Sequence, residues 1–182
     1  MTTLMKLLLL IYSSTLIYAQ QTSVSADNEI SMGNAVANSK GGTYKYYKKG
    51  EDKGFTGILY TLYENGNYLT RQEYKDGIGE GTWINYWPNG NLKKVGTYQS
   101  NKVEGPIKKY NQHGHLIAEG HYKDWRIRVK IWKYYNLNGQ VIKTVDYGDK
   151  GNFKDVKDFY QQGKISTYRY NQLKEKFDKS SS

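Results

Sequence analysis

The sequence has no cysteine, only 2 prolines among its 182 residues, and few long aliphatic side chains. The absence of cysteine excludes disulfide bonds and thiolate catalysis, so the stability of the fold must come from packing alone. A mean hydropathy of −0.83 argues against a thick globular core. No glycine-rich phosphate loop followed by a helix and no Asn-x-Ser/Thr sequon occur. These absences favour a thin structure built from short, repeated elements.

Tyrosine and glycine are abundant instead, with 19 residues of each, and the net charge is +10 at pH 7. Aromatic residues make up 15% of the chain. Tyrosines favour strands and glycines favour tight turns, so the composition indicates an all-β protein rich in hairpins.

The second half of the chain is a repeat with a period of 24 or 25 residues. A turn glycine marks each unit, and a period in this range indicates stacked supersecondary units. The turn glycines are Gly66, Gly90, Gly114, Gly139 and Gly163. Asn65-Gly66, Asn89-Gly90 and Asn138-Gly139 predict two-residue hairpin turns that require positive φ values.

Four further positions keep the same register in every unit or in nearly every unit. A large apolar residue comes first, as Leu59, Trp83, Ile107, Trp132 and Val156. Three residues later come Leu62, Tyr86, Tyr110, Tyr135 and Phe159. After the turn come Tyr68, Leu92, Leu116, Val141 and Ile165, then Tyr74, Tyr98, Tyr122 and Tyr147. We expect Trp83 and Trp132 to be structural stacking residues, and Tyr86, Tyr110 and Tyr135 to be candidate binding residues.

The spacing of these positions also predicts which side chains share a face of the sheet. In the second strand of a unit the two recurring residues, such as Leu92 and Tyr98, are six apart, which predicts one shared face. In the first strand the recurring residues, such as Trp83 and Tyr86, are three apart and cannot share a face without a bulge. The sequence leaves that second point open.

The chain divides into four segments. Residues 1–19 carry Lys6, an apolar run and Ala19, and they predict a secretory signal peptide cleaved after Ala19. Residues 20–42 are small and polar and predict a flexible linker. Residues 43–171 form the repeat domain, with units starting near residues 57, 81, 105, 130 and 154 and a degenerate capping hairpin at Thr43–Phe55. Residues 172–182 are expected to be a polar tail.

Basic residues recur beside the aromatic ones and would form a ladder if equivalent positions stack. The candidate binding cations are Lys108, Lys109, Arg126, Arg128, Lys130 and Lys133, with Lys93-Lys94 in the preceding unit. Such a ladder suits anionic lipid or polysaccharide, whereas export makes nucleic acid an unfavourable partner. The alternative is that these cations only keep the sheet soluble and block edge pairing.

Catalytic and metal sites find little support in the sequence. The three histidines, His113, His115 and His121, fall within one unit, at positions that polar surface residues occupy in other units. The carboxylates Glu104 and Glu119 recur too irregularly for an acid–base pair. We therefore expect no enzyme activity, no metal and no cofactor.

One unit carries a family resemblance. Its pattern is made of Gly81, Trp83, Tyr86, Asn89, Gly90, Leu92, Gly96 and Tyr98. This pattern resembles the MORN-repeat variant family, whose members are often labelled YwqK-like antitoxins. The resemblance implies a curled single-layer sheet of consecutive antiparallel β-hairpins with an aromatic groove, and binding rather than catalysis.

These observations lead to one main hypothesis and two alternatives. The main hypothesis is an exported, non-enzymatic protein-interaction module of the cell envelope or extracellular space, and the missing cysteines favour a bacterial envelope. The first alternative is a basic module that associates with anionic lipid or polysaccharide. The second alternative is antitoxin-like neutralisation of a partner protein.

Overall fold

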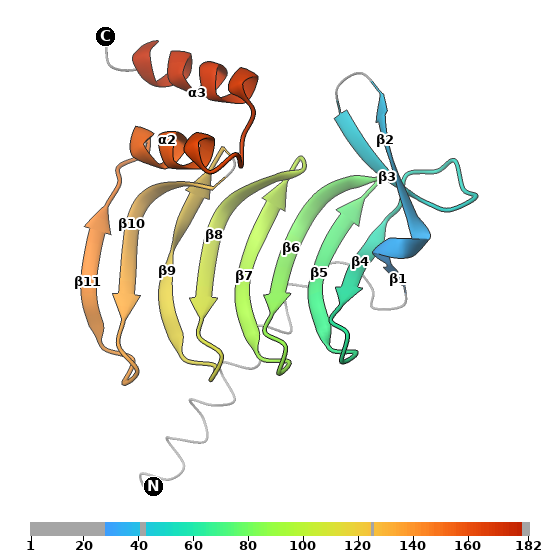
Figure 1. Cartoon of the computed structure of the whole chain (residues 1–182), viewed down its shortest axis with the longest axis horizontal. Helices are drawn as coiled ribbons and strands as arrows, with labels where there is room; N and C mark the ends of the chain where they lie inside the picture. Colours follow the sequence, from blue (N-terminus) through green and yellow to red (C-terminus); the bar gives the residue numbers. More distant parts are fainter. Residues whose placement is uncertain (1–27, 41–42, 125, 180–182) are drawn as a thin grey trace, which may run out of the picture.

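A computed structural model describes residues 28–40, 43–124 and 126–179 and shows one long open sheet (Figure 1). Its nine strands lie in the order β1-β4-β5-β6-β7-β8-β9-β10-β11. From β4 onward each strand pairs antiparallel with the next one in sequence, while β1 pairs parallel with β4. The prediction of an all-β, single-layer sheet of consecutive hairpins is therefore confirmed.

The strands of the main sheet are β1 (Glu29–Ser31), β4 (Gly57–Leu62), β5 (Tyr68–Lys75), β6 (Ile78–Tyr86), β7 (Leu92–Gln99), β8 (Lys102–Tyr110), β9 (Leu116–Lys123), β10 (Ile127–Tyr135) and β11 (Val141–Asp146). The remaining elements are η1 (Met32–Asn34), β2 (Ala35–Lys40), β3 (Thr43–Lys48), α2 (Phe153–Gln161) and α3 (Thr167–Lys179). Among the described elements, no helix is long and apolar enough to cross a membrane.

The turns at the two ends of the strands differ from the predicted types. In the β6–β7 turn the N–H of Gly90 donates to the carbonyl of Trp87 (2.9 Å), and only the glycine has positive φ, at +84°. This is a longer loop than the expected two-residue turn with two positive φ values. The two-residue turns lie at the other end, where Ser100 and Asn101 have φ values of 51° and 65° and connect the paired residues Gln99 and Lys102.

A register shift next to each glycine turn decides which face each side chain occupies. Trp83 lies opposite Gly96 and Asn85 opposite Lys94, but the next residue, Tyr86, lies opposite Leu92. The extra residue, and hence the bulge, is therefore in the second strand of the hairpin. Trp83 and Tyr86 lie on opposite faces, and the bulge places Leu92 opposite Tyr86 on the face away from Tyr98. The prediction that Leu92 and Tyr98 share a face is wrong.

The core lies on one face of this sheet, which we call the core face. Its buried residues are Trp83, Val103, Ile107, Ala118 and Trp132, with Tyr98, Tyr122, Tyr134 and Tyr147 packed against them. Trp132 is fully buried because its indole lies flat over the backbone of Gly120, where a Cβ atom would overlap the ring. The expected structural role of Trp83 and Trp132 agrees with this burial.

The predicted fifth hairpin is wrong, because residues 153–179 form the helices α2 and α3. Phe153 and Val156 are spaced three apart and share one side of α2, which starts at the N-cap Asn152. Val156 is fully buried against Ile127 of β10 and Leu173 of α3. The predicted polar tail is wrong as far as Lys179, because α3 buries Leu173, and Gly163 lies between two helices instead of in a hairpin turn.

The opposite end of the sheet is covered by residues that the sequence assigned to a flexible linker. The predicted linker is wrong for residues 29–40, which form β1, η1 and β2. The strand β3 pairs with β2, and the predicted capping hairpin at Thr43–Phe55 is reduced to one antiparallel bridge between Tyr47 and Gly54. Ile30, Met32 and Tyr46 pack against a buried cluster of Phe55, Leu59 and Tyr74. The predicted signal peptide, residues 1–19, lies outside the described residues.

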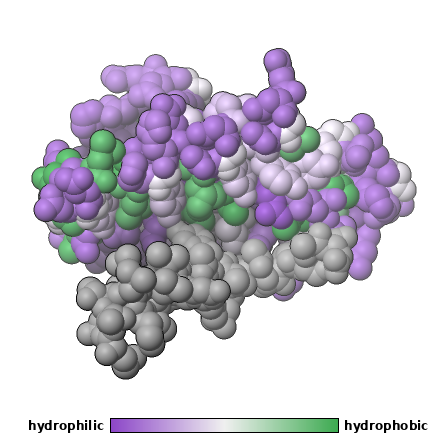
Figure 2. All heavy atoms as spheres, turned by 90° about the horizontal axis from the view of Figure 1, so that it is seen from below, coloured by the Kyte–Doolittle hydropathy of each residue, from purple (hydrophilic) through white to green (hydrophobic). Residues whose placement is uncertain are grey.

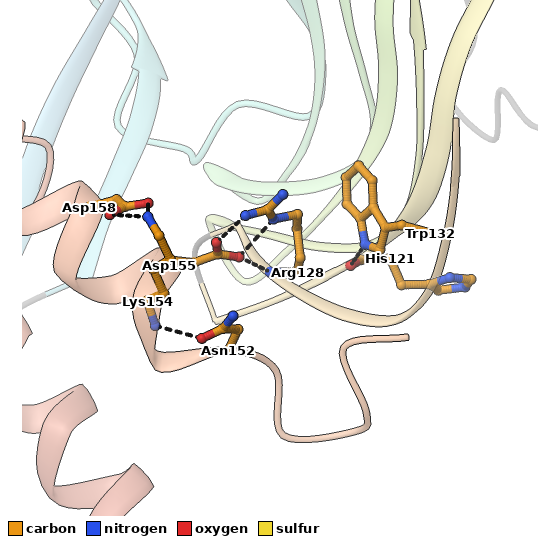
Figure 3. A network of polar contacts seen from close by, with 7 residues as sticks. All are labelled: His121, Arg128, Trp132, Asn152, Lys154, Asp155 and Asp158. Atoms are coloured by element: carbon orange, nitrogen blue, oxygen red, sulfur yellow. Dashed lines mark hydrogen bonds and ion pairs between the residues drawn. The ribbon is translucent and has the colours of Figure 1, made fainter. Parts of the chain in front are cut away.

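One buried ion pair attaches the helices to the sheet (Figure 3). Asp155 of α2, with an exposed fraction of only 4%, accepts hydrogen bonds from the backbone N–H and from the guanidinium of Arg128 in β10. The neighbouring pair of Lys154 and Asp158 is more exposed. Of these two pairs, the one formed by Asp155 joins α2 to the sheet, whereas Lys154 and Asp158 both belong to α2.

We expect Asp155→Ala to lower the free energy of unfolding by about 2 kcal/mol, because it leaves Arg128 and its backbone N–H without their buried acceptor. Asp158→Ala is the matched control, and it should cost less than about 0.5 kcal/mol because its partner Lys154 is mostly exposed. Urea unfolding of the two variants measures the difference. Equal midpoints would show that Asp155 does not anchor the helices.

Candidate interaction surfaces

The face opposite the core face, which we call the outer face, carries a row of paired apolar residues beside the glycine turns. The register places these pairs directly opposite each other in four consecutive hairpins. The pairs are Leu62–Tyr68, Tyr86–Leu92, Tyr110–Leu116 and Tyr135–Val141. We call this row the outer stripe. It contains all three tyrosines that the sequence predicted as binding residues.

The outer stripe is partly open to solvent and continues from one hairpin to the next. The exposed fractions are 47% for Leu62, 37% for Tyr68 and 50% for Val141. The rings of Tyr68 and Tyr86, which belong to adjacent hairpins, lie 5.9 Å apart. Viewed from the end of the sheet with the glycine turns, the surface shows apolar areas separated by hydrophilic ones (Figure 2). The outer stripe is a row of apolar pairs of which several side chains are open to solvent.

Polar contacts hold the stripe in place at both ends. The guanidinium of Arg71 donates two hydrogen bonds to Glu29 of β1, at 3.0 and 2.8 Å, and lies 5.2 Å from the ring centre of Tyr68. Hydrogen bonding to Glu29 raises the pKa of Arg71. At the other end the hydroxyl of Tyr135 donates to Glu119, and burial followed by this contact raises its pKa to about 12. These tyrosines are thus positioned before any partner binds.

The structure divides the predicted basic ladder between the two faces. Lys108 and Lys133 both lie opposite Glu119 on the outer face. Lys109 follows Lys108 and therefore lies on the core face, where its Nζ is 4.8 Å from the ring centre of Trp132. Adjacent residues in a strand point to opposite sides, so these cations cannot form one ladder.

The other predicted cations also have separate surroundings. Arg128 is bound to Asp155 and lies 4.6 Å from the ring centre of Tyr147. Lys130 is exposed, and its backbone pairs with that of Tyr147 and Gly148. Arg126 reaches back over the sheet, so that its guanidinium lies 5.3 Å from the ring centre of Trp83. Arg126 and Lys109 therefore share the core face with the buried tryptophans.

Two lysines of the core face are half-buried beside each other. Lys94 and Lys109 are paired in register between β7 and β8. Burial lowers the pKa of Lys94, and the nearby charges of Lys109, Arg126, Lys93 and Lys164 lower it further. Burial also lowers the pKa of Lys109, with Arg128 and Arg126 acting in the same direction and Tyr134 and Asp155 against it. Two like charges therefore lie side by side in a half-buried place.

The histidines do not assemble into a site. The backbone N–H groups of His113 and His115 both donate to Asn111 within an exposed turn. His121 lies in β9, and burial and the charge of Lys130 lower its pKa. Within residues 28–40, 43–124 and 126–179, no three His, Cys, Asp or Glu side chains are grouped as metal ligands would be.

Sequence reasoning missed Lys164, which belongs to the α2–α3 connection. It was placed in a hairpin that does not exist, and only a helical reading of residues 153–161 would have brought it to the core face. Lys94 was noted only as part of a dipeptide, because its pairing with Lys109 depends on the register shift between β7 and β8.

Residues 79–100 and 103–124 each match the family model described as MORN repeat variant. The two matches cover the hairpins β6–β7 and β8–β9, so the resemblance seen in the sequence is confirmed for these two repeats. Repeats of this kind generally act as protein- or membrane-interaction modules. The same hairpin geometry extends to β4–β5 and β10–β11. The YwqK-like antitoxin label stays a prediction.

No curated protein matches this chain. Two similar solved structures are crystal structures of TarM. A point mutant of S. aureus TarM in complex with fondaparinux, alpha-GlcNAc-glycerol and UDP has a TM-score of 0.33 and 15% identity, covering 62% of this chain and 20% of that one. The other TarM structure has a TM-score of 0.31 and 16% identity, covering 61% and 19%. The chain thus spans about a fifth of the length of these proteins.

Proposed function

We propose that this chain is an exported, non-enzymatic module that binds a protein partner through its outer stripe. Export is supported by the signal-peptide pattern of residues 1–19. A role in binding is supported by the two MORN-variant repeats. Neutralisation of a toxin would be one form of such binding.

The observation that carries the proposal is the continuous row of half-exposed aromatic and aliphatic pairs on a rigid sheet. Tyrosine is enriched at protein interfaces because its ring buries a large apolar area while its hydroxyl keeps a polar partner. The row repeats once per hairpin, so a partner that lies across the strands would meet an equivalent pair in each unit. Apolar rows rimmed by polar residues are typical of protein-binding surfaces.

We expect the double variant Tyr86→Ser with Tyr110→Ser to lose the partner, because the two central anchors of the stripe would be removed together. Residues 20–182 serve as bait for capture from the native envelope, and the captured partner is quantified after washing. The matched control is Tyr168→Ser, which removes a tyrosine from α3 that is 74% exposed. Thermal unfolding of each variant confirms that the fold is retained.

The response of binding to salt distinguishes an interaction through the apolar outer stripe from an interaction through ion pairs alone. Burial of apolar area tolerates salt, whereas at about 0.5 M salt the Debye length falls toward roughly 4 Å and exposed ion pairs are screened. The complex with the parent chain should therefore survive a wash at about 0.5 M salt. A partner that is retained by the double variant, or that is released from the parent chain by salt alone, would contradict the proposal.

A further inference from the structure

A recess of about 310 Å³ lies between the β9–β10 turn and the α2–α3 connection. Its lining includes Arg126 from the turn and Phe159, Lys164 and Ile165 from the helical cap. The charges of Arg126 and Lys164 both act on Lys94, which is paired in register with Lys109. We call Lys94, Lys109, Arg126 and Lys164 the core-face cations. Arg126 and Lys164 belong to the lining of the recess and are exposed, whereas Lys94 and Lys109 lie side by side and half-buried on the core face of the sheet.

Aromatic rings, and not carboxylates, accompany these cations. The Nζ of Lys109 lies 4.8 Å from the ring centre of Trp132 and 5.5 Å from that of Tyr122. The guanidinium of Arg126 lies over Trp83, and the Nζ of Lys164 lies 5.9 Å from the ring centre of Phe159. In the described part of the chain, none of the four has a carboxylate within ion-pair distance. Asp155, whose charge acts on Lys109, is already held by Arg128.

This arrangement is unfavourable for the protein alone. Moving a charge out of water costs free energy unless a counter-charge is supplied, and like charges placed together add repulsion. Burial and neighbouring cations lower the pKa values of both Lys94 and Lys109, which is the expected sign of such an uncompensated cluster. The aromatic rings offset only part of the cost. A bound anion would supply the missing counter-charge.

We propose that a small soluble anion of the phosphate class binds at the recess, held by Arg126 and Lys164 of its lining together with the paired Lys94 and Lys109 of the core face. Charge-assisted hydrogen bonds from ammonium and guanidinium groups are the usual means of binding a phosphate group. The recess can hold a phosphate with a small organic group attached. A small anion suits this place better than a planar membrane does, because Lys94 and Lys109 are half-buried on the core face. This site is separate from the outer stripe and does not depend on it.

The proposal makes an uncommon prediction about stability. A structural lysine stabilises the protein that contains it, whereas a binding lysine in an uncompensated cluster does not. Lys94→Met should therefore leave the melting temperature of the ligand-free chain unchanged or higher, because it removes a repelling charge and keeps an apolar stem of similar length. The same variant should bind the anion about tenfold more weakly or worse, since one charge-assisted contact is lost.

The test uses the full mature chain with pyrophosphate as the probe, measured by isothermal titration calorimetry and by the shift in melting temperature. Lys94→Met and Lys109→Met are the test variants. The control is Lys108→Met, which makes the same charge change one residue away on the outer face. We expect pyrophosphate to bind and stabilise the parent chain and Lys108→Met alike, and to lose both effects in Lys94→Met and Lys109→Met.

Two results would overturn the proposal. Equal weakening in Lys94→Met and Lys108→Met would show that pyrophosphate responds only to the net positive charge of the chain. The second result concerns lipid vesicles. If vesicles of phosphatidylglycerol sediment the parent chain but not Lys94→Met, and vesicles of phosphatidylcholine sediment neither, the core-face cations bind a membrane surface. If Lys109→Met does not fold because of its contact with Trp132, Lys94→Met alone decides the question.

Discussion

Trp132→Ala should lower the free energy of unfolding by about 3 to 5 kcal/mol, the usual cost of truncating a fully buried aromatic residue. The indole has no exposed surface and contacts the rings of Tyr122, Tyr134 and Tyr147. Its N–H also donates to the carbonyl of His121 at 3.1 Å. Truncation would leave a cavity and would remove the hydrogen-bond donor of the His121 carbonyl. It would also remove the indole ring beside Lys109. Urea unfolding measures the loss.

Tyr168→Ala is the control for this large-to-small change, because Tyr168 is 74% exposed on α3. It should change the stability by less than about 0.5 kcal/mol. If Trp132→Ala unfolds at the same urea concentration as Tyr168→Ala, the core face does not hold the repeats together.

Gly120→Ala should cost about 3 kcal/mol, at the upper end of the range for overpacking, although it adds only one methyl group. The added Cβ would overlap the indole of Trp132, which lies flat over this glycine and cannot move away because its N–H is bound to His121. This contact explains why a glycine stands at 120, two residues before the core-face residue Tyr122. At Gly96 the nearest atom is the flexible end of Ile107, so the same change should cost less there.

The control for Gly120→Ala is Gly33→Ala, where an added Cβ would meet only ordinary van der Waals contact at 3.6 Å. We expect the free energy of unfolding of this control to lie within about 0.5 kcal/mol of that of the parent chain. A Gly120→Ala variant as stable as Gly33→Ala would show that Trp132 does not lie across the β9 backbone as described.

The repeat could be predicted from the sequence at those positions where only one type of residue fits the structure. A positive φ at Gly66 or Gly90 requires glycine, and a large residue that covers the next strand requires a glycine there. These requirements recur once per hairpin, so the positions and order of the hairpins from β4 to β11 followed from spacing, although the same spacing wrongly predicted a further hairpin in the region of α2 and α3. The burial of Trp83 and Trp132 followed from the same register.

The ends of the repeat could not be read in this way, because capping elements do not share its pattern. Val156 and Gly163 coincide with repeat positions by spacing, yet Phe153 and Val156 also fit a helical period. The helix forms because Val156 reaches Ile127 and Leu173, a long-range contact that no local pattern reveals. Residues 29–40 are similarly ordered by pairing with β4 and β3, which their polar composition did not predict.

The candidate interaction surfaces could likewise be predicted only in part from the sequence. Alignment placed Tyr86, Tyr110 and Tyr135 in one row, and the structure keeps them together on the outer stripe. The basic residues were grouped by composition, but a side chain's face depends on one-residue register. Lys108 and Lys109 therefore lie on opposite faces. The register shift between β7 and β8, whose extra residues are in β8 and which pairs Lys94 with Lys109, was not predicted from the sequence.

The most direct test of the proposed function is photo-crosslinking from two adjacent positions on opposite faces. A photoreactive phenylalanine derivative replaces either Tyr86, on the outer stripe, or Asn85, on the core face, and the chain is irradiated in the native envelope, where the proposal places it. The account predicts a specific protein adduct from position 86 and none from position 85. An adduct from position 85 alone would contradict it, because the protein partner would then occupy the core face.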